Sequence, residues 1–162
     1  MTEDFIKLNK KDTLRLEIRT ADNKPTGEYL EFDLEDIELP LKYQELIEKD
    51  KKNKENLQNE LYIINKRQDI KGKKLLSKNE EDKIRAINNF MKKEVEIYNI
   101  FLGENGVQKL LNGQKLTWTA LNVIDEIIEK QVVPKLDIKM DDIASKIKEK
   151  YNLFSKDKEV LK

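Results

Sequence analysis

The sequence predicts an α+β protein that is mainly α, with an N-terminal β-hairpin packed on a bundle of four to five helices. Alternating apolar and charged residues near the N-terminus indicate strands, and apolar residues at steps of three and four through most of the remainder indicate helices. Glycine and proline stand where several helical patterns stop. With 162 residues the chain has the length of one ordinary domain. We expect that domain at residues 1–154 and a flexible tail at 155–162.

The predicted hairpin covers residues 12–35. Its alternating apolar residues are Leu14, Leu16 and Ile18, then Leu30, Phe32 and Leu34. Between the two runs, Lys24-Pro25-Thr26-Gly27 has proline and glycine where a type I turn prefers them. Phe5 and Leu8 are candidates for a third strand. Because an isolated hairpin is marginal in water, this one must pack on the helices or pair with another chain.

The first predicted helix, at about residues 40–65, contains a segment at 48–56 that is almost wholly charged or amidic. Two interpretations stay open there. The pattern favours one long helix whose middle turns are exposed, and the alternative is a break between two short helices. Residues 66–74 contain Gly72 and indicate a connector.

The second predicted helix, at about 79–102, is the centre of the chain. Ser77 can cap it, since a serine hydroxyl accepts from the backbone N–H three residues on. Gly103 suits its left-handed C-terminal position. Its expected inward residues are Ile84, Ile87, Met91, Val95, Tyr98 and Phe101 or Leu102, with Phe90 and Ile97 widening the stripe.

A tight elbow follows, with a short helix at 107–112 and a helix at 117–133. Thr117 can cap the longer one, and Pro134 should stop it because proline lacks an N–H. The expected inward residues of that helix are Trp118, Leu121, Ile124, Ile128 and Val132. Helices joined by so short a connection usually pack antiparallel. A last helix is expected at about 138–153.

The amino-acid composition excludes several kinds of chemical site. The chain has no cysteine and no histidine, which removes disulfides, thiolate ligands, cysteine nucleophiles and the commonest metal ligand. It has 32 Lys and Arg residues and 32 Asp and Glu residues, so no net charge draws it to nucleic acid or to anionic membrane. No apolar run approaches a membrane span or a signal sequence. We expect a cytoplasmic, non-enzymatic protein with no catalytic residues, no cofactor and no metal.

Three local patterns could still carry chemistry. The first is four carboxylates at the exit of the hairpin, Asp33, Glu35, Asp36 and Glu38. Clustered carboxylates can bind a cation, but strand alternation divides these between two faces, so a solvated sheet edge is favoured. The second is a basic run, Lys66, Arg67, Lys71, Lys73 and Lys74. Without interleaved aromatics, a solvated connector is favoured over a nucleic-acid site.

The third pattern is Gly103-x-x-Gly106, which could cradle a phosphate. It follows a helix rather than a strand and lacks the Lys-Ser/Thr pair of a P-loop. A helix end followed by a tight elbow is therefore the simpler interpretation.

Aromatic residues near the elbow are candidates for contact with a partner, since aromatics dominate interface hot spots. For Trp118, the only tryptophan, a place in the core is favoured over an interface, and the same holds for Tyr98 and Phe101. The predicted partner-binding residues are Tyr98, Phe101, Leu102, Trp118 and Leu121.

Two blocks of the sequence resemble a known family. They are Asp33 to Tyr43, which follows the hairpin, and Ile97 to Gly113, which spans the elbow. Both resemble small tail assembly chaperones encoded in tail modules of phages of Gram-positive bacteria, and the similarity extends over roughly Leu14 to Pro134. In that family a more acidic residue commonly stands where this chain has Asn99, and here Leu102 separates Phe101 from Gly103.

The resemblance implies a binding role rather than catalysis. The protein would coat the long, apolar tape-measure protein until tail-tube subunits polymerise around it. An alternative is a structural tail component, such as a completion or connector subunit, which uses the exposed hairpin to pair between chains. A nucleic-acid-binding regulator that uses residues 66–74 is the weakest option. The sequence is also compatible with a homo-oligomer.

Overall fold

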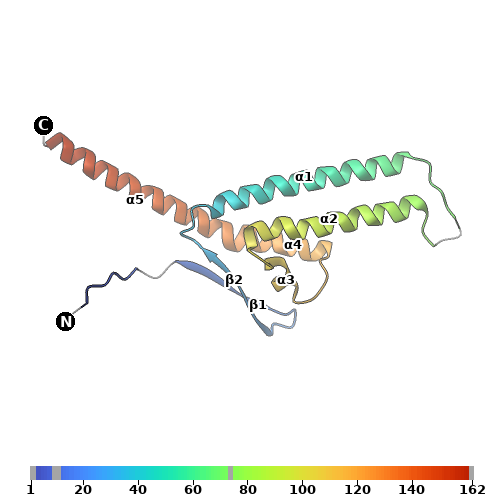
Figure 1. The fold of residues 1–162 in the computed structure, drawn as a ribbon, viewed down its shortest axis with the longest axis horizontal. Helices are drawn as coiled ribbons and strands as arrows, with labels where there is room; N and C mark the ends of the chain where they lie inside the picture. The colour runs from blue at the N-terminus through green and yellow to red at the C-terminus, as the bar shows by residue number, and fades with distance from the viewer. Residues whose placement is uncertain (1–2, 9–11, 73–74, 161–162) are drawn as a thin grey trace.

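The computed structural model describes residues 3–8, 12–72 and 75–160 (Figure 1). In chain order the elements are β1 (Thr13–Arg19), β2 (Pro25–Asp33), α1 (Leu39–Lys66), α2 (Lys78–Leu102), α3 (Gly106–Leu111), α4 (Trp118–Ile127), the π-helical turn η1 (Ile128–Val132) and α5 (Val133–Val160). The predicted fold class is confirmed: the chain is mainly helical, with an N-terminal hairpin packed against helices. The described residues form one sheet of two strands, without the third strand considered for Phe5 and Leu8.

The hairpin pairs its apolar residues on one face. Leu14 lies opposite Phe32 and Leu16 lies opposite Leu30 in an antiparallel register. Leu14, Leu30 and Phe32 are buried in the main core. The period-two alternation of the sequence therefore marks the face that packs on the helices.

The turn of the hairpin lies earlier in the chain than predicted. The Asn23 N–H donates to the Thr20 carbonyl at 2.9 Å, and Asn23 adopts a left-handed φ of 62°. Asparagine tolerates this conformation, so the turn forms before Lys24-Pro25-Thr26-Gly27 is reached. Pro25 instead begins β2, where the absence of a backbone N–H is tolerated at a strand start.

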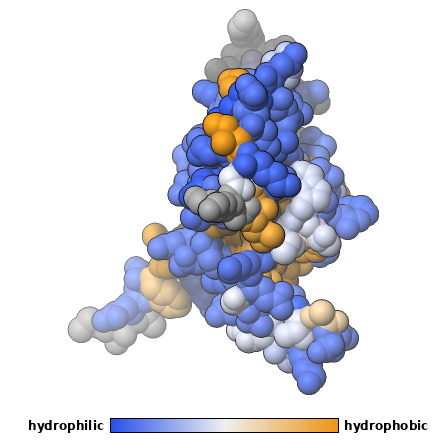
Figure 2. All heavy atoms as spheres, turned by 90° about the vertical axis from the view of Figure 1, so that its right-hand side faces the viewer, coloured by the Kyte–Doolittle hydropathy of each residue, from blue (hydrophilic) through white to orange (hydrophobic). Residues whose placement is uncertain are grey.

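Helix α1 is continuous over 28 residues, as the favoured interpretation held. It runs antiparallel to α2, and the two form a long helical hairpin (Figure 1). The expectation that the middle turns of α1 are exposed is wrong at one position, because Asn53 is buried against α2. Viewed toward the closed end of this hairpin, the surface is mostly hydrophilic, with separate hydrophobic patches (Figure 2).

The predicted caps of α2 and α4 are confirmed. The Ser77 hydroxyl accepts from the Glu80 N–H at 3.1 Å, and the Thr117 hydroxyl accepts from the Ala120 N–H at 3.1 Å. The inward face of α2 differs from the prediction, because Ile84 and Ile87 are exposed. The buried residues of α2 are Asn79, Ala86, Phe90, Glu94, Ile97, Tyr98, Phe101 and Leu102.

The neighbours of α2 also differ from the prediction. Its antiparallel partner is α1, whereas α4 runs in the same direction as α2 after the elbow and α3 have carried the chain back (Figure 1). The buried residues of α4 and η1 are Leu121, Ile124, Ile128 and Val132. They join the main core together with the hairpin and the end of α2.

Pro134 does not end the helix, contrary to the prediction. The chain stays helical from Trp118 to Val160, because the π-helical turn η1 precedes the proline. In that turn the Val133 N–H donates to the carbonyl of Ile128, five residues earlier. A π turn widens the helix locally, and this relieves the clash between a proline ring and the carbonyl four residues before it.

Helix α5 projects away from the body of the molecule (Figure 1). Leu136 near its start is buried, whereas Ile147 and Tyr151 farther along are exposed. The predicted separate helix at 138–153 is thus the outer part of a longer one. The backbone is helical to Val160, where a frayed tail was expected, and residues 161 and 162 lie outside the described residues.

Candidate protein-binding groove

Four of the five predicted partner-binding residues lie inside the protein. They are Tyr98, Phe101, Leu102 and Leu121, all buried in the main core. The ring centroid of Phe101 lies 5.4 Å from those of both Phe32 and Tyr43, so this residue joins α2 to the hairpin and to α1. In this structure these four residues hold the fold together, and of the four Leu102 alone also lines a surface hollow.

Trp118 is the exception, because 57% of it is exposed. A place in the core was the favoured interpretation, and it is wrong. Trp118 is the first residue of α4, one turn before Leu121, where the buried face of that helix begins. It therefore lies at the end of the helix, beyond the packed core.

A groove of about 560 Å³ lies between the sheet and α4, with the residues on either side of Trp118, Thr117 and Thr119, among those that line it. β1 contributes four consecutive residues, Leu16 to Arg19, whereas β2 contributes only Leu30. The groove thus lies on the β1 side of the sheet. Its apolar lining includes Leu16, Ile18, Leu111, Ala120, Val123 and Ile127.

The rim of this groove is polar. Glu17 and Arg19 form an ion pair at 3.1 Å on the β1 side, and Gln114 and Gln131 line the helical side. Half of Val123 is exposed at the opening. An apolar lining with a polar rim is the usual anatomy of a surface that binds protein.

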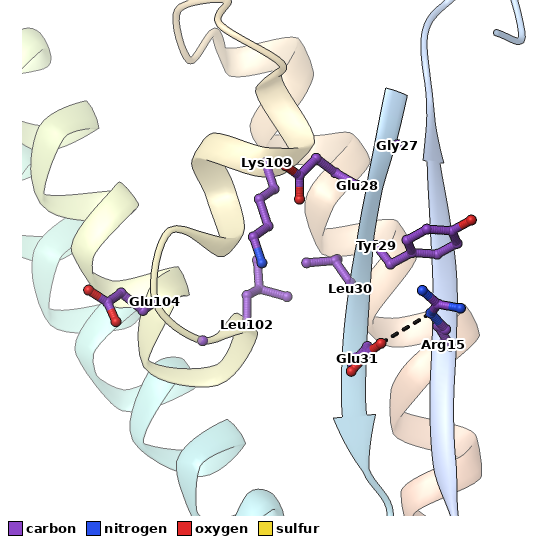
Figure 3. A pocket seen from close by; sticks show the side chains of 10 residues that line it. Arg15, Gly27, Glu28, Tyr29, Leu30, Glu31, Leu102, Glu104 and Lys109 are labelled. Carbon is purple, nitrogen blue, oxygen red and sulfur yellow. Dashed lines mark ion pairs between the residues drawn. The ribbon is translucent and has the colours of Figure 1, made fainter. Parts of the chain in front are cut away.

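A second, smaller hollow of about 380 Å³ lies along β2, between the strand and the elbow (Figure 3). Arg15 Nε pairs with Glu31 Oε1 at 3.1 Å, and its guanidinium lies 3.7 Å from the ring centroid of Tyr29. Lys109 extends from α3 toward Leu102, alongside the strand (Figure 3). The arginine here is engaged by the sheet itself, so this hollow is the weaker candidate for a binding site.

Between α1 and α2 lies a buried polar cluster that the sequence analysis did not identify. Glu94 is fully buried, and its Oε1 accepts from Asn53 Nδ2 at 2.8 Å. Asp50 accepts from Lys54 Nζ at 2.9 Å through Oδ2. Burial, and then hydrogen bonding to Asp50, raise the pKa of Glu94 to about 8. The Glu94 carboxyl is therefore mostly protonated at neutral pH.

A proton on Glu94 accounts for two buried carboxyl oxygen atoms that otherwise lack a hydrogen-bond donor. Asp50 Oδ1 and Glu94 Oε2 have no other hydrogen-bond partner among the described groups. Carboxylate oxygens only accept, so two carboxylates would leave both atoms unsatisfied. A proton on Glu94 lets it donate to Asp50, and this satisfies both atoms at once.

A related contact joins α2 to α4. The Tyr98 hydroxyl donates to Asp125 Oδ1, and burial followed by this hydrogen bond raises the pKa of Tyr98. The hydroxyl thus stays protonated and remains a donor. The arrangement is structural, since it positions α4, whose outer surface forms one wall of the groove.

The other predicted patterns have structural roles. Among the hairpin-exit carboxylates, Asp33 Oδ1 accepts from the Glu35 N–H at 3.0 Å and Asp36 Oδ1 accepts from the Glu38 N–H at 2.9 Å. They shape the turn into α1. No group of acidic side chains among the described residues is arranged to hold a metal ion.

In the basic run, Arg67 donates to Asn79 at 2.8 Å and pairs with Asp82, which fixes the connector to the start of α2. Lys73 and Lys74 lie outside the described residues. Gly103 ends α2 as predicted, with a positive φ of 92°, but its ψ of 174° differs from the left-handed helical conformation that was expected. A Cβ on Gly106 would lie 2.5 Å from the Leu102 Cβ, so this glycine permits the tight elbow.

Sequence reasoning missed the polar cluster because it tracked apolar residues alone. Leu46, Asp50 and Asn53 follow steps of four and three along α1, and Phe90, Glu94 and Ile97 do the same along α2. Polar residues that continue a helical stripe were the available signal. The groove has no such signal, because its walls come from parts of the chain about 100 residues apart.

Within the described residues, no helix combines the length and the apolar character needed to cross a bilayer. Comparisons with protein-family models, curated proteins and solved structures found no match for this chain.

Proposed function

We propose that this chain is a non-catalytic binding protein that holds an apolar segment of another protein in the groove between β1 and α4. The observation that supports this proposal is the open, apolar groove of about 560 Å³, with the exposed Trp118 beside it. Burial of apolar surface contributes roughly 25 cal/mol per Å². Aromatic side chains at such sites often supply much of the binding energy.

We further propose that the partner is a phage tail protein, and the tape-measure protein foremost. The resemblance of residues 14–134 to tail assembly chaperones supports this assignment. In that role the protein acts in the cytoplasm of the bacterial host and covers apolar surface of the tape-measure protein. It leaves when tail-tube subunits replace it, and no bond is made or broken.

Co-expression with fragments of a tape-measure protein tests this function. We expect the fragment to become more soluble and to co-elute with the chain. Val123→Glu should weaken co-elution at least tenfold, because it places a charge in the opening of the groove. Ile63→Glu is the matched control, since Ile63 is exposed on α1 and does not line the groove.

Two results would contradict the proposal. One is a fragment that is no more soluble with the chain than without it. The other is equal loss of co-elution for Val123→Glu and Ile63→Glu, which would show that the groove is not the binding surface.

A second candidate function is a structural subunit of the tail. The two-stranded sheet supports it, because its strands have edges that can pair with another chain. Mass spectrometry of purified particles separates the two functions. A structural subunit stays in the particle in stoichiometric amounts, whereas a chaperone is lost from it.

A further inference from the structure

The N-terminal segment before β1 carries apolar side chains without a partner in this structure. We call residues 3–8 the arm. Phe5, Ile6 and Leu8 are 84%, 94% and 87% exposed, respectively. The arm leads away from the sheet (Figure 1). Exposing three large apolar side chains of one short segment to water is unfavourable, and burying them would be favourable.

The outer edge of β1 offers backbone groups that could pair with such a segment. The Leu34 N–H donates to the Asp12 carbonyl, so these two residues form a hydrogen-bonded pair at the end of the ladder. Such pairs alternate along an antiparallel ladder. The backbone groups of Thr13, Arg15 and Glu17 therefore point away from β2. No described segment pairs there as a third strand.

We propose that the arm of one copy of this chain adds to the outer edge of β1 of a second copy, antiparallel to it, with Lys7 opposite Glu17. The sheet then gains a third strand, whose inward side chains extend the apolar face beside the groove. This inference goes beyond the proposed function, since it concerns the purified protein alone.

The side chains of the arm fit this register. Ile6 lies opposite Ile18 and Leu8 lies opposite Leu16, so both point to the face that lines the groove. On the other face, Lys7 meets the carboxylate of Glu17. Opposite charges directly across a ladder stabilise the pairing, and a shift of one residue would turn Lys7 inward.

The remaining outward pair in this register is Phe5 opposite Arg19. An arginine over an aromatic ring is attracted by the negative face of the ring. The same sheet already contains such a contact, between Arg15 and Tyr29. Each position of the arm from Phe5 to Leu8 thus meets a residue of matching chemistry.

The arm cannot reach this register within its own chain. Asp12 is already held in the ladder by the Leu34 N–H, and in this register Leu8 lies opposite Leu16, four residues farther along β1. The three residues between Leu8 and Asp12 would have to span that length and also reverse the chain, which an extended backbone is too short to do. The nearest own-chain register that points Ile6 inward places Lys7 opposite Arg15, a like charge. A second copy has no such restriction, and this is why the occupant is the arm of another molecule.

Light scattering coupled to size exclusion tests the assembly. We expect the mass of the full chain to rise above the 19.2 kDa monomer with increasing concentration. Ile6→Asp should weaken self-association at least tenfold. Ile70→Asp is the control, because Ile70 is similarly exposed but lies in the connector between α1 and α2. A mass of one monomer at every concentration would overturn the proposal.

Disulfide trapping tests the register. Because the chain has no native cysteine, only the introduced cysteines can form a disulfide. A Lys7→Cys chain is mixed with a Glu17→Cys chain and oxidised. We expect a covalent heterodimer, and at least tenfold less when Glu28→Cys on β2 replaces Glu17→Cys. Equal trapping by both, or an intramolecular disulfide in the double variant of a single chain, would overturn the inference.

Charge reversal supplies a readout that does not depend on cysteine. Lys7→Glu and Glu17→Lys should each weaken self-association several-fold, and the double variant should restore most of it. Failure of the double variant to recover would contradict the placement of Lys7 opposite Glu17. Both side chains are on the surface or its rim, so the monomer fold is preserved in all three variants.

Discussion

The side-chain amide of Asn53 donates a 2.8 Å hydrogen bond to the carboxyl of Glu94 across the interface between α1 and α2. The same amide also donates to the Phe90 carbonyl at 3.3 Å. Both residues are buried, so this polar contact joins the middle of the helical hairpin, and buried Asn79 of α2 makes a second one by donating to the Ile64 carbonyl at 3.1 Å. Asp50 and Lys54 complete this cluster on the α1 side.

Glu94 should make the stability of the protein depend on pH. Its pKa is about 8 in the fold against 4.5 as the ordinary value, so the folded state binds this proton more tightly than the unfolded state does. This contribution to stability is fully present below about pH 4.5 and is lost as pH rises to about 8. The loss is on the order of a few kcal/mol, since one pKa unit corresponds to about 1.4 kcal/mol.

Glu94→Gln is the variant that checks this dependence. An amide has the shape of the protonated carboxyl, can donate to Asp50 and does not titrate. We expect urea unfolding of the wild type to show falling stability from pH 5 to pH 8.5, and the variant to lack that fall. Parallel pH profiles for the two proteins would refute the assignment of a proton to Glu94.

Asn53→Ala should destabilise the protein by about 1–3 kcal/mol, because it leaves a buried carboxyl oxygen without its donor. Asn56→Ala is the control, since Asn56 is exposed one turn along the same helix. Chemical denaturation of both variants measures the difference. Equal stability of the two variants would mean that water replaces the lost amide.

Local rules predicted much of this fold. The strand pairing, the Ser77 cap, the Thr117 cap and the Gly103 helix end each depend on a few neighbouring residues, and all four are present. Two local rules that depended on proline failed. A π turn precedes Pro134 and lets the helix continue through it, and Pro25 begins a strand because the turn forms earlier, at Asn23. Pro40, in contrast, lies in the first turn of α1, where proline is favoured.

Predicting the groove and the polar cluster would have required knowing which distant segments of the chain pack against each other. Glu94 became a core residue only because α1, and not the following helix, is the antiparallel partner of α2. Likewise, the burial of Leu121 and the exposure of Trp118 depend on where the core ends along α4. The spacing of apolar residues predicts which face of a helix is buried. It does not predict which other helix packs on that face, or how far along the helix the contact extends.

Gly103→Ala should cost about 1–3 kcal/mol of stability, because a φ of 92° strains any residue that has a Cβ. No atom lies within 4 Å of the position that the new Cβ would take, so the cost comes from the backbone rather than from a clash. Gly72→Ala has equally open surroundings without a positive φ and should be nearly neutral. Thermal unfolding of the two variants compares the same added methyl group with and without a positive φ. Equal melting temperatures would contradict this account.

Tyr98→Phe should cost about 1–2 kcal/mol, since it removes the hydroxyl that donates to Asp125 and leaves the ring in the core. Tyr62→Phe is the control, because Tyr62 is exposed on α1. The contact joins α2 to α4, the helix that forms one wall of the groove. Its loss should therefore also increase amide hydrogen exchange along α4 relative to α1. If exchange rises equally in both helices, the hydroxyl contributes to global stability without holding α4 in place.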